Sequence, residues 1–521
     1  MDTLLNKLGT LVNSTIEGFD RMIFRGTIGT IQRSSGMMSF LRSRGLLNKE
    51  YKDWAQAQTE LIVESAERLS QEGCGRGVEY IPSLNTRKEE LAHARQKERK
   101  VSQGLIGVWS CVESCNTFKA VFDPEANYPA MLPVRSKCKH LYFYFADPVY
   151  GFMSIRIQTW APYEVQVAMN GREWLARSLD TKGCGYLKSG NKFLHIDDYG
   201  LAQQLLDSQA DVCFKEVLDG FLPAAFPCKE EVLGPKLSYY WTFWQTEVAK
   251  DYIFKNHADL EALMDDIQLH AFITGKGSRI LKYFGGPARL DGMPRKGADP
   301  QITSKTNTWH DGARVKHWCD KNSLKLYSEQ NVLRCEMTMN NPERFRIYRH
   351  VEGQDKSEPK KLRQMRKGVV DTKARYDISK AAIDRLTEHV AAFTQDERLG
   401  NVLSLAGSPL MSSGKKFRAV DAFGKDQALL AAVSDPANDV CAITNKGLQK
   451  ALKGTPWAKG MVGRQLSSRI SRHLRLLREH GLIRKLPNQR KYVLTDKGRR
   501  LSAAVDAALA TSVDGLLKLA A

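Results

Sequence analysis

Residues 464–500 read RQLSSRISRHLRLLREHGLIRKLPNQRKYVLTDKGRR, and this stretch decides the fold of the C-terminal part of the chain. The spacing predicts a helix over 464–480, because its apolar residues fall on one side of a helical cylinder. These residues are Leu466, Ile470, Leu474 and Leu477. Gly481 is typical of a helix C-terminus. The segments 482–485 and 491–495 indicate two strands joined by a basic turn.

Further helices are predicted on both sides of this stretch, over 426–433, over 444–452 and from about residue 496 onward. The order helix, helix, helix, β-hairpin, helix is that of a winged-helix domain. Residues 473–501 resemble the same segment of bacterial winged-helix regulators of the MarR and ArsR kinds. The resemblance covers 424–505 and implies that the third helix enters the major groove of duplex DNA.

By this resemblance, the third helix presents polar and basic side chains to the bases or backbone of DNA. These are Ser467, Ser468, Arg469, Arg472 and Arg475. The wing residues Arg490 and Lys491 would reach the flanking phosphates or the minor groove. The alternative is a winged helix that contacts another protein. The basic wing and four arginines of the helix favour nucleic acid, namely Arg469, Arg472, Arg475 and Arg478.

The charge of the whole chain agrees with a polyanionic partner. Its 521 residues include 78 Lys and Arg against 58 Asp and Glu, a formal net charge of +20. Each neutralised phosphate releases counterions, which favours binding; the alternative is a basic protein without such a partner. No run of about 18 apolar residues is present and no cleavable signal is visible. A membrane partner is therefore not expected. The expected location is the bacterial cytoplasm, in association with the nucleoid. A homo-oligomer is compatible with the sequence.

The sequence predicts an α+β multidomain protein with a helical N-terminal region, a mixed α/β central body and a C-terminal winged helix. The predicted ranges are a helical region over 1–100, an α+β domain over 101–235, an α+β domain with a candidate active-site hairpin over 236–350, a basic linker and helix over 351–423, and the winged-helix domain over 424–521. The N-terminus reads as an amphipathic helix, because apolar residues recur at helical spacing. They are Leu4, Leu5, Leu8, Leu11, Val12 and Ile16.

Three stretches between these elements suggest binding surfaces or loops. Residues 353–375 are basic and poor in apolar side chains, which indicates a linker or an arm that follows phosphates. Its basic residues include Lys360, Lys361, Arg363, Arg366 and Lys367. The aromatic run at 239–244 is suited to stacking unpaired bases, although core packing is the commoner role of such a run. The Gly-rich passage over 284–312 lacks the strand-to-helix context of a phosphate-binding loop.

The ten cysteines are scattered along the chain and form no CxxC pair. None has a histidine partner at zinc-finger spacing. Cys111 and Cys115 are four residues apart in a segment that begins as a strand. Reduced core thiols of a cytoplasmic protein are favoured over a metal site here.

The strongest candidate for chemistry is the segment 314–342, RVKHWCDKNSLKLYSEQNVLRCEMTMNNP. Strand alternation places Lys325 and Tyr327 on one face of one strand, and Arg334 and Glu336 on one face of the next. Paired across a hairpin, these residues would gather an ammonium, a phenol, a guanidinium and a carboxylate. The alternative is an ordinary amphipathic hairpin in which Arg334 and Glu336 form a surface ion pair.

This segment resembles the K-x-Y-(D/N)-K … L-R-x-E stretch of rolling-circle replication initiators of phages and plasmids. The resemblance implies that Tyr327 attacks a DNA phosphate and that Glu336 binds a metal or acts as a base. Lys325 and Arg334 would then stabilise the developing phosphate charge. The implied cofactor is Mg²⁺ or Mn²⁺, and no organic cofactor is expected. The chain departs from the pattern at 328–330, where Ser-Glu-Gln stands, and it has no His-hydrophobic-His metal motif.

Other carboxylates of a type that binds Mg²⁺ are scattered and form no diagnostic pattern. They are Asp147, Glu164, Asp197, Asp198, Glu247 and Asp251, beside Glu336. Asp20 is expected to pair with Arg21 or Arg25. The predicted function is a DNA-processing or replication-initiation (nicking) protein of a mobile or extrachromosomal element. The alternatives are a non-enzymatic winged-helix regulator or nucleoprotein component, and a structured-RNA-binding protein.

Overall fold

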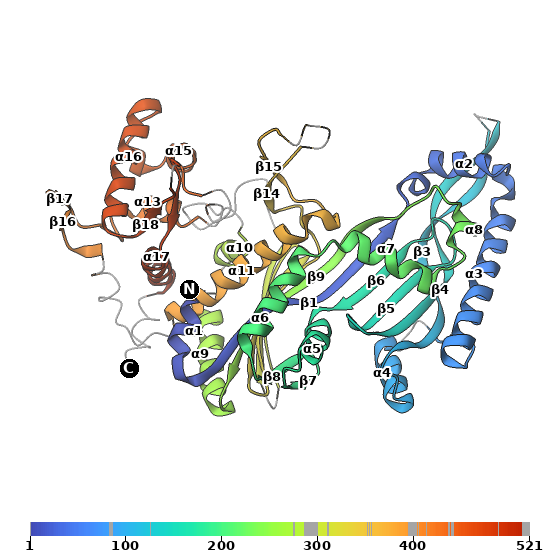
Figure 1. Cartoon of the computed structure of the whole chain (residues 1–521). Coiled ribbons are helices and arrows are strands. Elements are labelled where there is room, and N and C mark those ends of the chain that lie inside the picture. The colour runs from blue at the N-terminus through green and yellow to red at the C-terminus, as the bar shows by residue number, and fades with distance from the viewer. Residues whose placement is uncertain are drawn as a thin grey trace.

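The computed structural model describes the chain except for residues 1, 83–86, 125–126, 275–276, 286–300, 310–311, 352, 354, 356, 394–403, 405, 413, 436–437, 439–441, 488 and 513–521. The greater part of the Gly-rich passage predicted over 284–312 lies outside the described residues. The described chain is a mixed α+β structure (Figure 1), as the composition and patterning predict.

The described residues form a sheet of eleven strands, in the order β10-β11-β12-β13-β9-β1-β6-β5-β4-β3-β2. Its strands are β1 (Val12–Thr27), β2 (Glu79–Tyr80), β3 (Gly104–Asp123), β4 (Tyr128–Asp147), β5 (Gly151–Gln158), β6 (Val165–Asn170), β9 (Tyr240–Phe254), β10 (Ile302–Trp309), β11 (Gly312–Cys319), β12 (Asn322–Glu329) and β13 (Val332–Met339). Neighbouring strands are antiparallel, apart from β2 and β3. Strands from the predicted ranges 1–100, 101–235 and 236–350 therefore share one sheet.

The N-terminal helix predicted from the spacing of its leucines is wrong beyond its first turns. Helix α1 (Thr3–Leu8) ends early, and β1 begins at Val12 in the middle of the sheet. β1 pairs with β6 on one side and with β9 on the other. Because both edges of this strand are hydrogen-bonded to segments far away in the sequence, tertiary pairing overrides the local helical periodicity.

Helices and a small hairpin cover the sheet on both faces near its centre. Helices α9 (His257–Thr274) and α11 (Thr372–Phe393) pack against β9 and β11–β13. Helices α5 (Gly171–Lys182) and α6 (Tyr199–Ser208) pack on β1, and the hairpin β7 (Tyr186–Ser189)–β8 (Lys192–Ile196) contacts β9 and β13. Lys250 of β9 reaches Asp384 of α11, whereas Arg334 of β13 reaches the β7–β8 connection at Asn191. Successive strand residues point to opposite faces, so these two coverings lie on opposite faces of the sheet.

Over the half of the sheet formed by β3–β6, the coverings come from the first half of the chain. Helices α2 (Ser34–Ser43), α3 (Tyr51–Cys74) and α7 (Phe214–Ala225) share one hydrophobic core with β1 and β4–β6. Helix α4 (Lys88–Arg99) packs on β3 through a separate small core around Trp109. The short helix α8 (Lys229–Leu233) contributes to the same core, whereas α10 (Gly277–Tyr283) packs against α11, β10 and β11 at the other end of the sheet.

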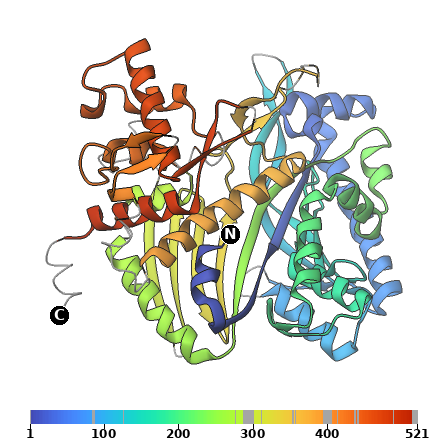
Figure 2. The same cartoon turned by 60° about the vertical axis from the view of Figure 1, so that its left-hand side comes forward.

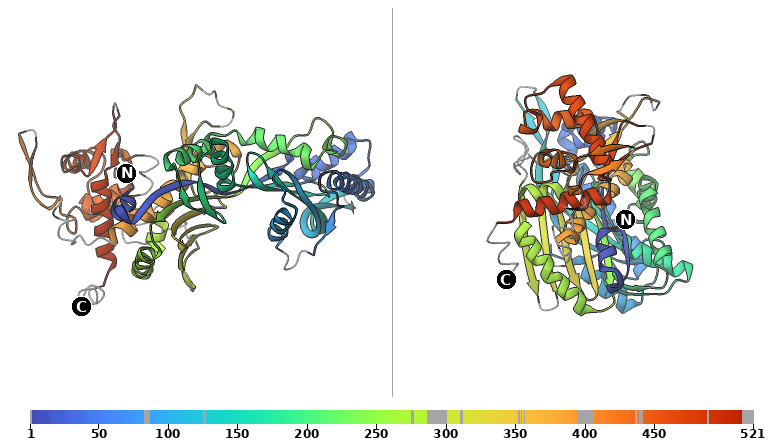
Figure 3. Two further views of the ribbon diagram at one scale, coloured as in Figure 1. Left: turned by 60° about the horizontal axis from the view of Figure 1, so that its bottom comes forward. Right: turned by 90° about the vertical axis from the view of Figure 1, so that its left-hand side faces the viewer.

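The C-terminal part has its own hydrophobic core, and each element predicted for it is present within a few residues. Its elements are α13 (Gln427–Val433), α15 (Asn445–Leu452), α16 (Gly463–Glu479), β18 (Ile483–Lys485), β19 (Tyr492–Leu494) and α17 (Asp496–Ala510). A bridge between Ile443 and Tyr492 adds a third segment to the β18–β19 hairpin. Helix α17 lies beside α11 (Figure 2), and Lys282 Nζ is 2.7 Å from Asp506 Oδ2. The C-terminal part thus docks on one end of the body (Figure 3).

The basic linker predicted over 353–375 is instead mostly ordered secondary structure. Strand β15 (Lys361–Gln364) pairs with β14 (Arg346–Arg349), and a 3-10 turn over Val369–Asp371 leads into α11. Arg366 donates to both carboxylate oxygens of Asp371, at 3.1 and 2.8 Å. The segment 353–375 was predicted from its composition to be a linker or an arm. It is held in place by the backbone hydrogen bonds of the β14–β15 hairpin and by the bidentate pair of Arg366 with Asp371.

The expectation that all cysteines are reduced is wrong for one pair. Cys115 and Cys138 are joined by a disulfide, with their Cα atoms 6.6 Å apart. Cys111 and Cys115 do not meet, because four residues of extended strand separate them by about 13 Å. The other described cysteines are free.

A β-bulge in the central strand shapes the middle of the sheet. Phe19 pairs with Val248 and Met22 with Thr246, so Asp20 and Arg21 together stand opposite Glu247. Such a bulge re-aims side chains and is common beside active sites. Gly171, at the start of α5, lies against this bulge, where an added Cβ would stand 2.2 Å from the carbonyl oxygen of Phe19.

We expect Gly171→Ala to destabilise the protein by about 1–3 kcal/mol, because helix α5 and the bulge must move apart to admit the methyl group. Thermal unfolding followed by circular dichroism measures the change. Gly220→Ala is the matched control, since nothing lies within 4 Å of its added Cβ in α7; a helical Gly→Ala change is worth about 0.5–1 kcal/mol in the stabilising direction. Equal unfolding temperatures for the two variants would contradict the close contact.

Candidate active site

The structure brings the four predicted catalytic side chains to one face of two neighbouring strands. In the β12–β13 register, Lys325 stands opposite Glu336 and Tyr327 opposite Arg334. Arg334 and Glu336 are buried, with 1% and 3% of their surfaces exposed. The hairpin predicted from strand alternation is therefore present, but it lies inside the molecule rather than on its surface.

Glu336 belongs to a cluster of three carboxylates. Oxygens of Asp20 on β1, Glu247 on β9 and Glu336 on β13 lie within 4.8 Å of one another. The bulge aims Asp20 at Glu247, and Glu247 stands opposite Thr338, two residues beyond Glu336 on the same face of β13. Three carboxylates brought together in a mostly buried place repel one another unless cations or protons neutralise them.

Lys325 and Tyr327 supply part of that neutralisation. The ammonium of Lys325 donates to Glu336 and lies 3.9 Å from Glu247 Oε1. The Tyr327 hydroxyl donates to Glu336 Oε2 at 3.3 Å. Thr338 Oγ1 donates to Glu336 Oε1 at 3.2 Å. Glu336 is thus surrounded by donors on one side and faces two further carboxylates on the other.

Arg334 does not pair with Glu336, so the predicted surface ion pair is wrong. Its guanidinium donates to both carboxylate oxygens of Asp251, at 2.6 and 2.8 Å, and to Asp20 Oδ2 at 3.1 Å. The strand register explains the difference, because Arg334 stands directly opposite Asp251 of β9. A second buried guanidinium, that of Arg172, lies 3.2 Å from Asp251 Oδ2.

Asp20 likewise does not take the partners expected from the sequence. It accepts hydrogen bonds from Arg334 and Asn191. Arg21 instead lies 3.6 Å from Glu89 of α4, and Arg25 donates to Glu164. Neither arginine pairs with Asp20, because the bulge turns the Asp20 carboxylate toward β9 and β13.

The cluster holds more negative charge than its lysine neutralises. Burial, with the charge of Glu336, raises the pKa of Glu247 to about 7. Burial also raises the pKa of Asp20, despite the nearby Arg334. The pKa of Asp251 is lowered because Arg334 and Arg172 outweigh the effect of burial. Burial raises the pKa of the Tyr327 hydroxyl above its ordinary value. Oxygen ligands of this kind fit Mg²⁺ or Mn²⁺.

A row of lysines leads across the sheet to this cluster. Lys305 of β10 stands opposite Lys316 of β11, which stands opposite Lys325 of β12. Burial lowers the pKa of Lys316, and the charges of Lys325 and Arg314 lower it further. Within the described part of the chain, Lys305, Lys316 and Arg314 form no ion pair with a carboxylate. Like charges placed opposite each other on neighbouring strands are unfavourable, so this row is suited to a bound polyanion.

Two tryptophans accompany these cations. Lys316 Nζ lies 4.4 Å from the centre of the Trp318 ring, and the guanidinium of Arg314 lies 6.0 Å from that of Trp309. Trp309 is 43% exposed. Exposed rings beside cations are the usual elements of surfaces that bind unpaired nucleotides. This row was not predicted, although the alternation of basic and apolar residues within 312–319 contained the signal for it.

On the predicted recognition helix, α16, some of the five predicted residues are exposed and others contact the rest of the C-terminal part. Ser468, Arg472 and Arg475 are exposed. Ser467 Oγ donates to Asn445 Oδ1 of α15 at 3.1 Å, and the half-buried guanidinium of Arg469 stacks 4.6 Å from the Trp457 ring. Two of the five predicted residues therefore hold the helix in place.

The predicted wing and basic arm supply further cations. Arg490 is exposed, whereas Lys491 Nζ lies 5.6 Å from the Tyr348 ring of β14. Of the basic residues predicted for the arm, Lys360, Lys361, Arg363 and Lys367 are exposed, and Lys367 Nζ lies 3.6 Å from Glu343 Oε1. The β14–β15 hairpin and α16 rise on the same side of the molecule (Figure 1). Arg366 is committed to Asp371.

The aromatic run at 239–244 is divided between the core and the surface. Tyr239, Trp241 and Phe243 are buried, because they face the helices that cover β9. Tyr240 and Trp244 are 57% and 52% exposed on the other face. Strand alternation thus separates core packing from a surface that is suited to stacking.

The remaining carboxylates of the sequence prediction are used locally. Asp147 accepts from the backbone N–H groups of Val149 and Tyr150 in a turn. Asp198 caps α6, and Asp197 pairs with His195. None of these three contributes to the cluster of Asp20, Glu247 and Glu336.

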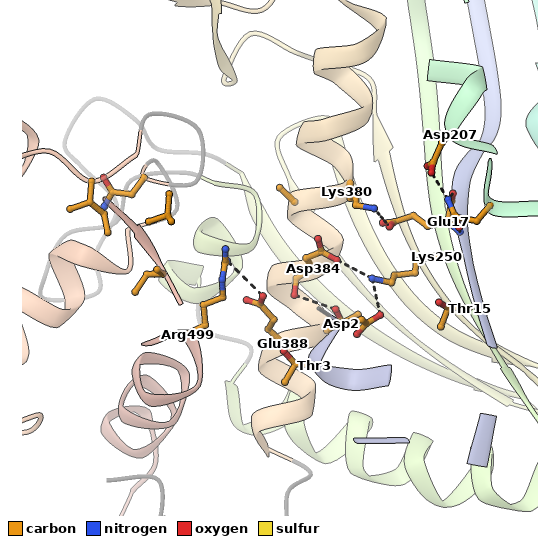
Figure 4. A pocket seen from close by; sticks show the side chains of 17 residues that line it. Asp2, Thr3, Thr15, Glu17, Asp207, Lys250, Lys380, Asp384, Glu388 and Arg499 are labelled. Carbon is orange, nitrogen blue, oxygen red and sulfur yellow. Dashed lines mark hydrogen bonds and ion pairs between the residues drawn. The ribbon is translucent and has the colours of Figure 1, made fainter. Parts of the chain in front are cut away.

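A polar cavity of about 560 Å³ lies on the opposite face of β9, between α1, α11 and the C-terminal part (Figure 4). Lys250 lies in its wall, and Lys250 Nζ is 2.8 Å from Asp2 Oδ2 and 3.0 Å from Asp384 Oδ1. Lys380 donates to Glu17 from α11. Ion pairs within the wall balance most of its charges, in contrast with the excess of carboxylates around Glu247.

We expect Glu247→Gln to raise the unfolding temperature of the metal-free protein by about 1–3 °C at pH 8. The raised pKa means that the wild type loses stability as the pH rises from about 4.5 to 7, while Gln stays neutral. The two proteins should therefore unfold together near pH 4.5. Thermal unfolding in chelator across this range measures the effect.

Glu113→Gln is the control, and it is expected to change the stability at pH 8 in the opposite direction. Its carboxylate is 3.1 Å from both Lys88 Nζ and Arg156 NH2, and hydrogen bonds outweigh burial and lower its pKa to about 2. The glutamine should destabilise the protein at pH 8. A stabilising effect of both substitutions, or of neither, would contradict the charge balance described for the cluster.

No family model, no curated protein and no solved structure matches this chain. Among the described helices, none is long and apolar enough to cross a membrane. What the site does must therefore be inferred from its own chemistry.

Proposed function

We propose that this chain is a DNA-processing protein that cleaves a phosphodiester bond at the cluster of Asp20, Glu247 and Glu336. The observation that carries the proposal is the assembly of these three carboxylates from three strands, with Lys325 and Tyr327 in contact. Clusters of this kind bind divalent cations that serve phosphoryl transfer. A bound Mg²⁺ or Mn²⁺ would neutralise the phosphate and the leaving oxygen.

Tyr327 is the proposed nucleophile. Its hydroxyl gives its proton to Glu336, to which it is already hydrogen-bonded at 3.3 Å. The phenolate oxygen then bonds to phosphorus while the bond from phosphorus to the 3′ oxygen breaks, and the proton taken up by Glu336 passes to that 3′ oxygen. The products are a 5′-phosphotyrosine adduct and a free 3′ hydroxyl. Lys325 would bind a non-bridging phosphate oxygen.

Arg334 takes a different role from the one that the resemblance implies. All three of its nitrogens donate to Asp251, Asp20 or Asn191. It is therefore a positioning residue that fixes Asp20, rather than a group that contacts phosphate.

The C-terminal part is proposed to be the winged-helix domain that addresses the protein to duplex DNA. The element order, the bridge between Ile443 and Tyr492 and the exposed Arg472, Arg475 and Arg490 support this assignment. A cleaving body with a site-recognising domain suits replication initiation in a bacterial mobile or extrachromosomal element. The row Lys305–Lys316–Lys325 would guide the strand toward Tyr327.

A second candidate is a non-enzymatic regulator or nucleoprotein component, or a binder of structured RNA. The buried pairs of Arg334 with Asp20 and Asp251 favour it, because they give Asp20 a structural partner without any metal. In that case the cluster would only join three strands.

We expect Tyr327→Phe to abolish a covalent protein–DNA adduct when labelled single-stranded DNA is incubated with the full chain and Mn²⁺. Denaturing gels detect both the adduct and the cleaved strand. Tyr142→Phe is the matched control, another strand tyrosine whose hydroxyl donates to a carboxylate, Glu113, at 2.7 Å. It should retain adduct formation.

Two outcomes would count against this assignment. Cleavage that survives Tyr327→Phe but disappears in Glu336→Gln would mean that water is the nucleophile. Absence of cleavage with every divalent metal, while DNA is still bound, would favour the regulator.

We expect the double variant Arg472→Ala, Arg475→Ala to bind duplex DNA at least tenfold more weakly, because both arginines are exposed on α16. The slope of log affinity against log salt should fall by about one for each phosphate that the variant no longer neutralises. Fluorescence anisotropy over a salt series measures both. Arg478→Ala is the control, since Arg478 is already paired with Glu479 at 2.6 Å. Unchanged DNA affinity, or a weakening confined to an RNA competitor, would contradict the assignment of α16 as the DNA-recognition helix.

A further inference from the structure

A second group of metal-ligand side chains lies on β3 and β4, apart from the carboxylate cluster. The sulfurs of Cys115 and Cys138 and a ring nitrogen of His140 lie within 4.8 Å of one another. The three residues are 7%, 8% and 0% exposed. In the antiparallel register Cys115 stands opposite Ser136, so the two sulfurs meet diagonally across the strand pair.

His140 has an unsatisfied nitrogen in this buried place. Its Nδ1 lies 3.1 Å from the carbonyl oxygen of Cys138, which makes Nδ1 the protonated nitrogen. Its Nε2 is buried and has no hydrogen-bond partner among the described residues. Leaving a buried polar atom unpaired costs about 1–3 kcal/mol. A ring nitrogen with a lone pair, held by a backbone hydrogen bond at the other nitrogen, is the arrangement found in histidines that bind metals.

We propose that Cys115, Cys138 and His140 form a Zn²⁺ site when the two cysteines are reduced. Reduction of the disulfide by a dithiol consumes two electrons and two protons, and it yields two thiols and the oxidised dithiol. Zinc binding then releases one proton from each thiol. The resulting bonds are two from sulfur and one from Nε2, and a fourth position stays open to water.

The distances allow this ion without a large rearrangement. Zn–S bonds of about 2.3 Å and Zn–N bonds of about 2.0–2.1 Å place tetrahedral ligands about 3.5–3.8 Å apart. The two sulfurs and one ring nitrogen of His140 already lie within 4.8 Å of one another. Thiolate and imidazole ligands select zinc, whereas the oxygens of Asp20, Glu247 and Glu336 suit Mg²⁺ or Mn²⁺. The two sites therefore take different metals.

The site would fasten two unusually long strands. β3 and β4 each span 20 residues, and they pair along nearly their whole length. An ion bound across them would fix this register close to its middle. This role does not depend on the proposed DNA cleavage, since none of its ligands contacts the carboxylate cluster.

The test is the zinc content of the full-length protein, purified under reducing conditions without chelator and measured by mass spectrometry of the metal. We expect about one Zn²⁺ per chain in the wild type and loss of at least four-fifths of it in Cys138→Ser. Cys319→Ser is the matched control, a buried free thiol on β11, and it should keep its zinc. Replacement by Co²⁺ should give thiolate-to-cobalt absorption in the wild type and the control only.

A measurement on the wild type tests the same site without the variant, in case Cys138→Ser does not fold. Zinc is added to the reduced, metal-free protein, and free thiols are alkylated and mapped. Protection of Cys115 and Cys138 by zinc supports the site. A reduced wild type that binds no zinc, a Cys138→Ser variant that keeps it, or equal alkylation of both thiols with and without zinc overturns it.

Discussion

The buried guanidinium of Arg334 is the interaction on which the centre of this protein depends. It joins β13 to β9 through Asp251 and to β1 through Asp20. Removing one partner of such a buried pair costs about 3–5 kcal/mol, because the other charge is left without compensation. The same contacts hold Asp20 beside Glu247 and Glu336. A structural ion network therefore positions the carboxylates proposed for chemistry.

The carboxylate cluster is a place where stability conflicts with the proposed function. Three acids meet where Lys325, together with an Arg334 guanidinium that is shared with Asp251, offsets only part of their charge, and burial raises the pKa of Glu247 to about 7. A purely structural core would be more stable with an amide or an apolar residue at this position. On the other face of β9, Lys250 is balanced by Asp2 and Asp384. The imbalance is thus confined to the face that also bears the row of lysines and the exposed tryptophans.

Local periodicity predicted the parts of the fold that short-range interactions determine. The helix over 464–480, the following hairpin and the β12–β13 pair were all predicted, because their pattern of apolar residues repeats within one element. The first strand was not. Leu4, Leu8 and Ile16 fit a helical spacing, yet Val12–Thr27 gains hydrogen bonds on both edges from β6 and β9. For the same reason the predicted ranges 1–100, 101–235 and 236–350 all contribute strands to one sheet.

The sequence by itself determined which residues share a face: Lys325 with Tyr327, and Arg334 with Glu336. Only the tertiary structure decided their partners. Asp20 and Arg334 are 314 residues apart in the chain, and the order of strands and one bulge bring them together. A charge pairs with whichever opposite charge the register places beside it, and register between distant strands follows from packing of the whole sheet. For that reason the sequence contained the members of the site, whereas the fold selected Asp20 and Glu247 from among many carboxylates.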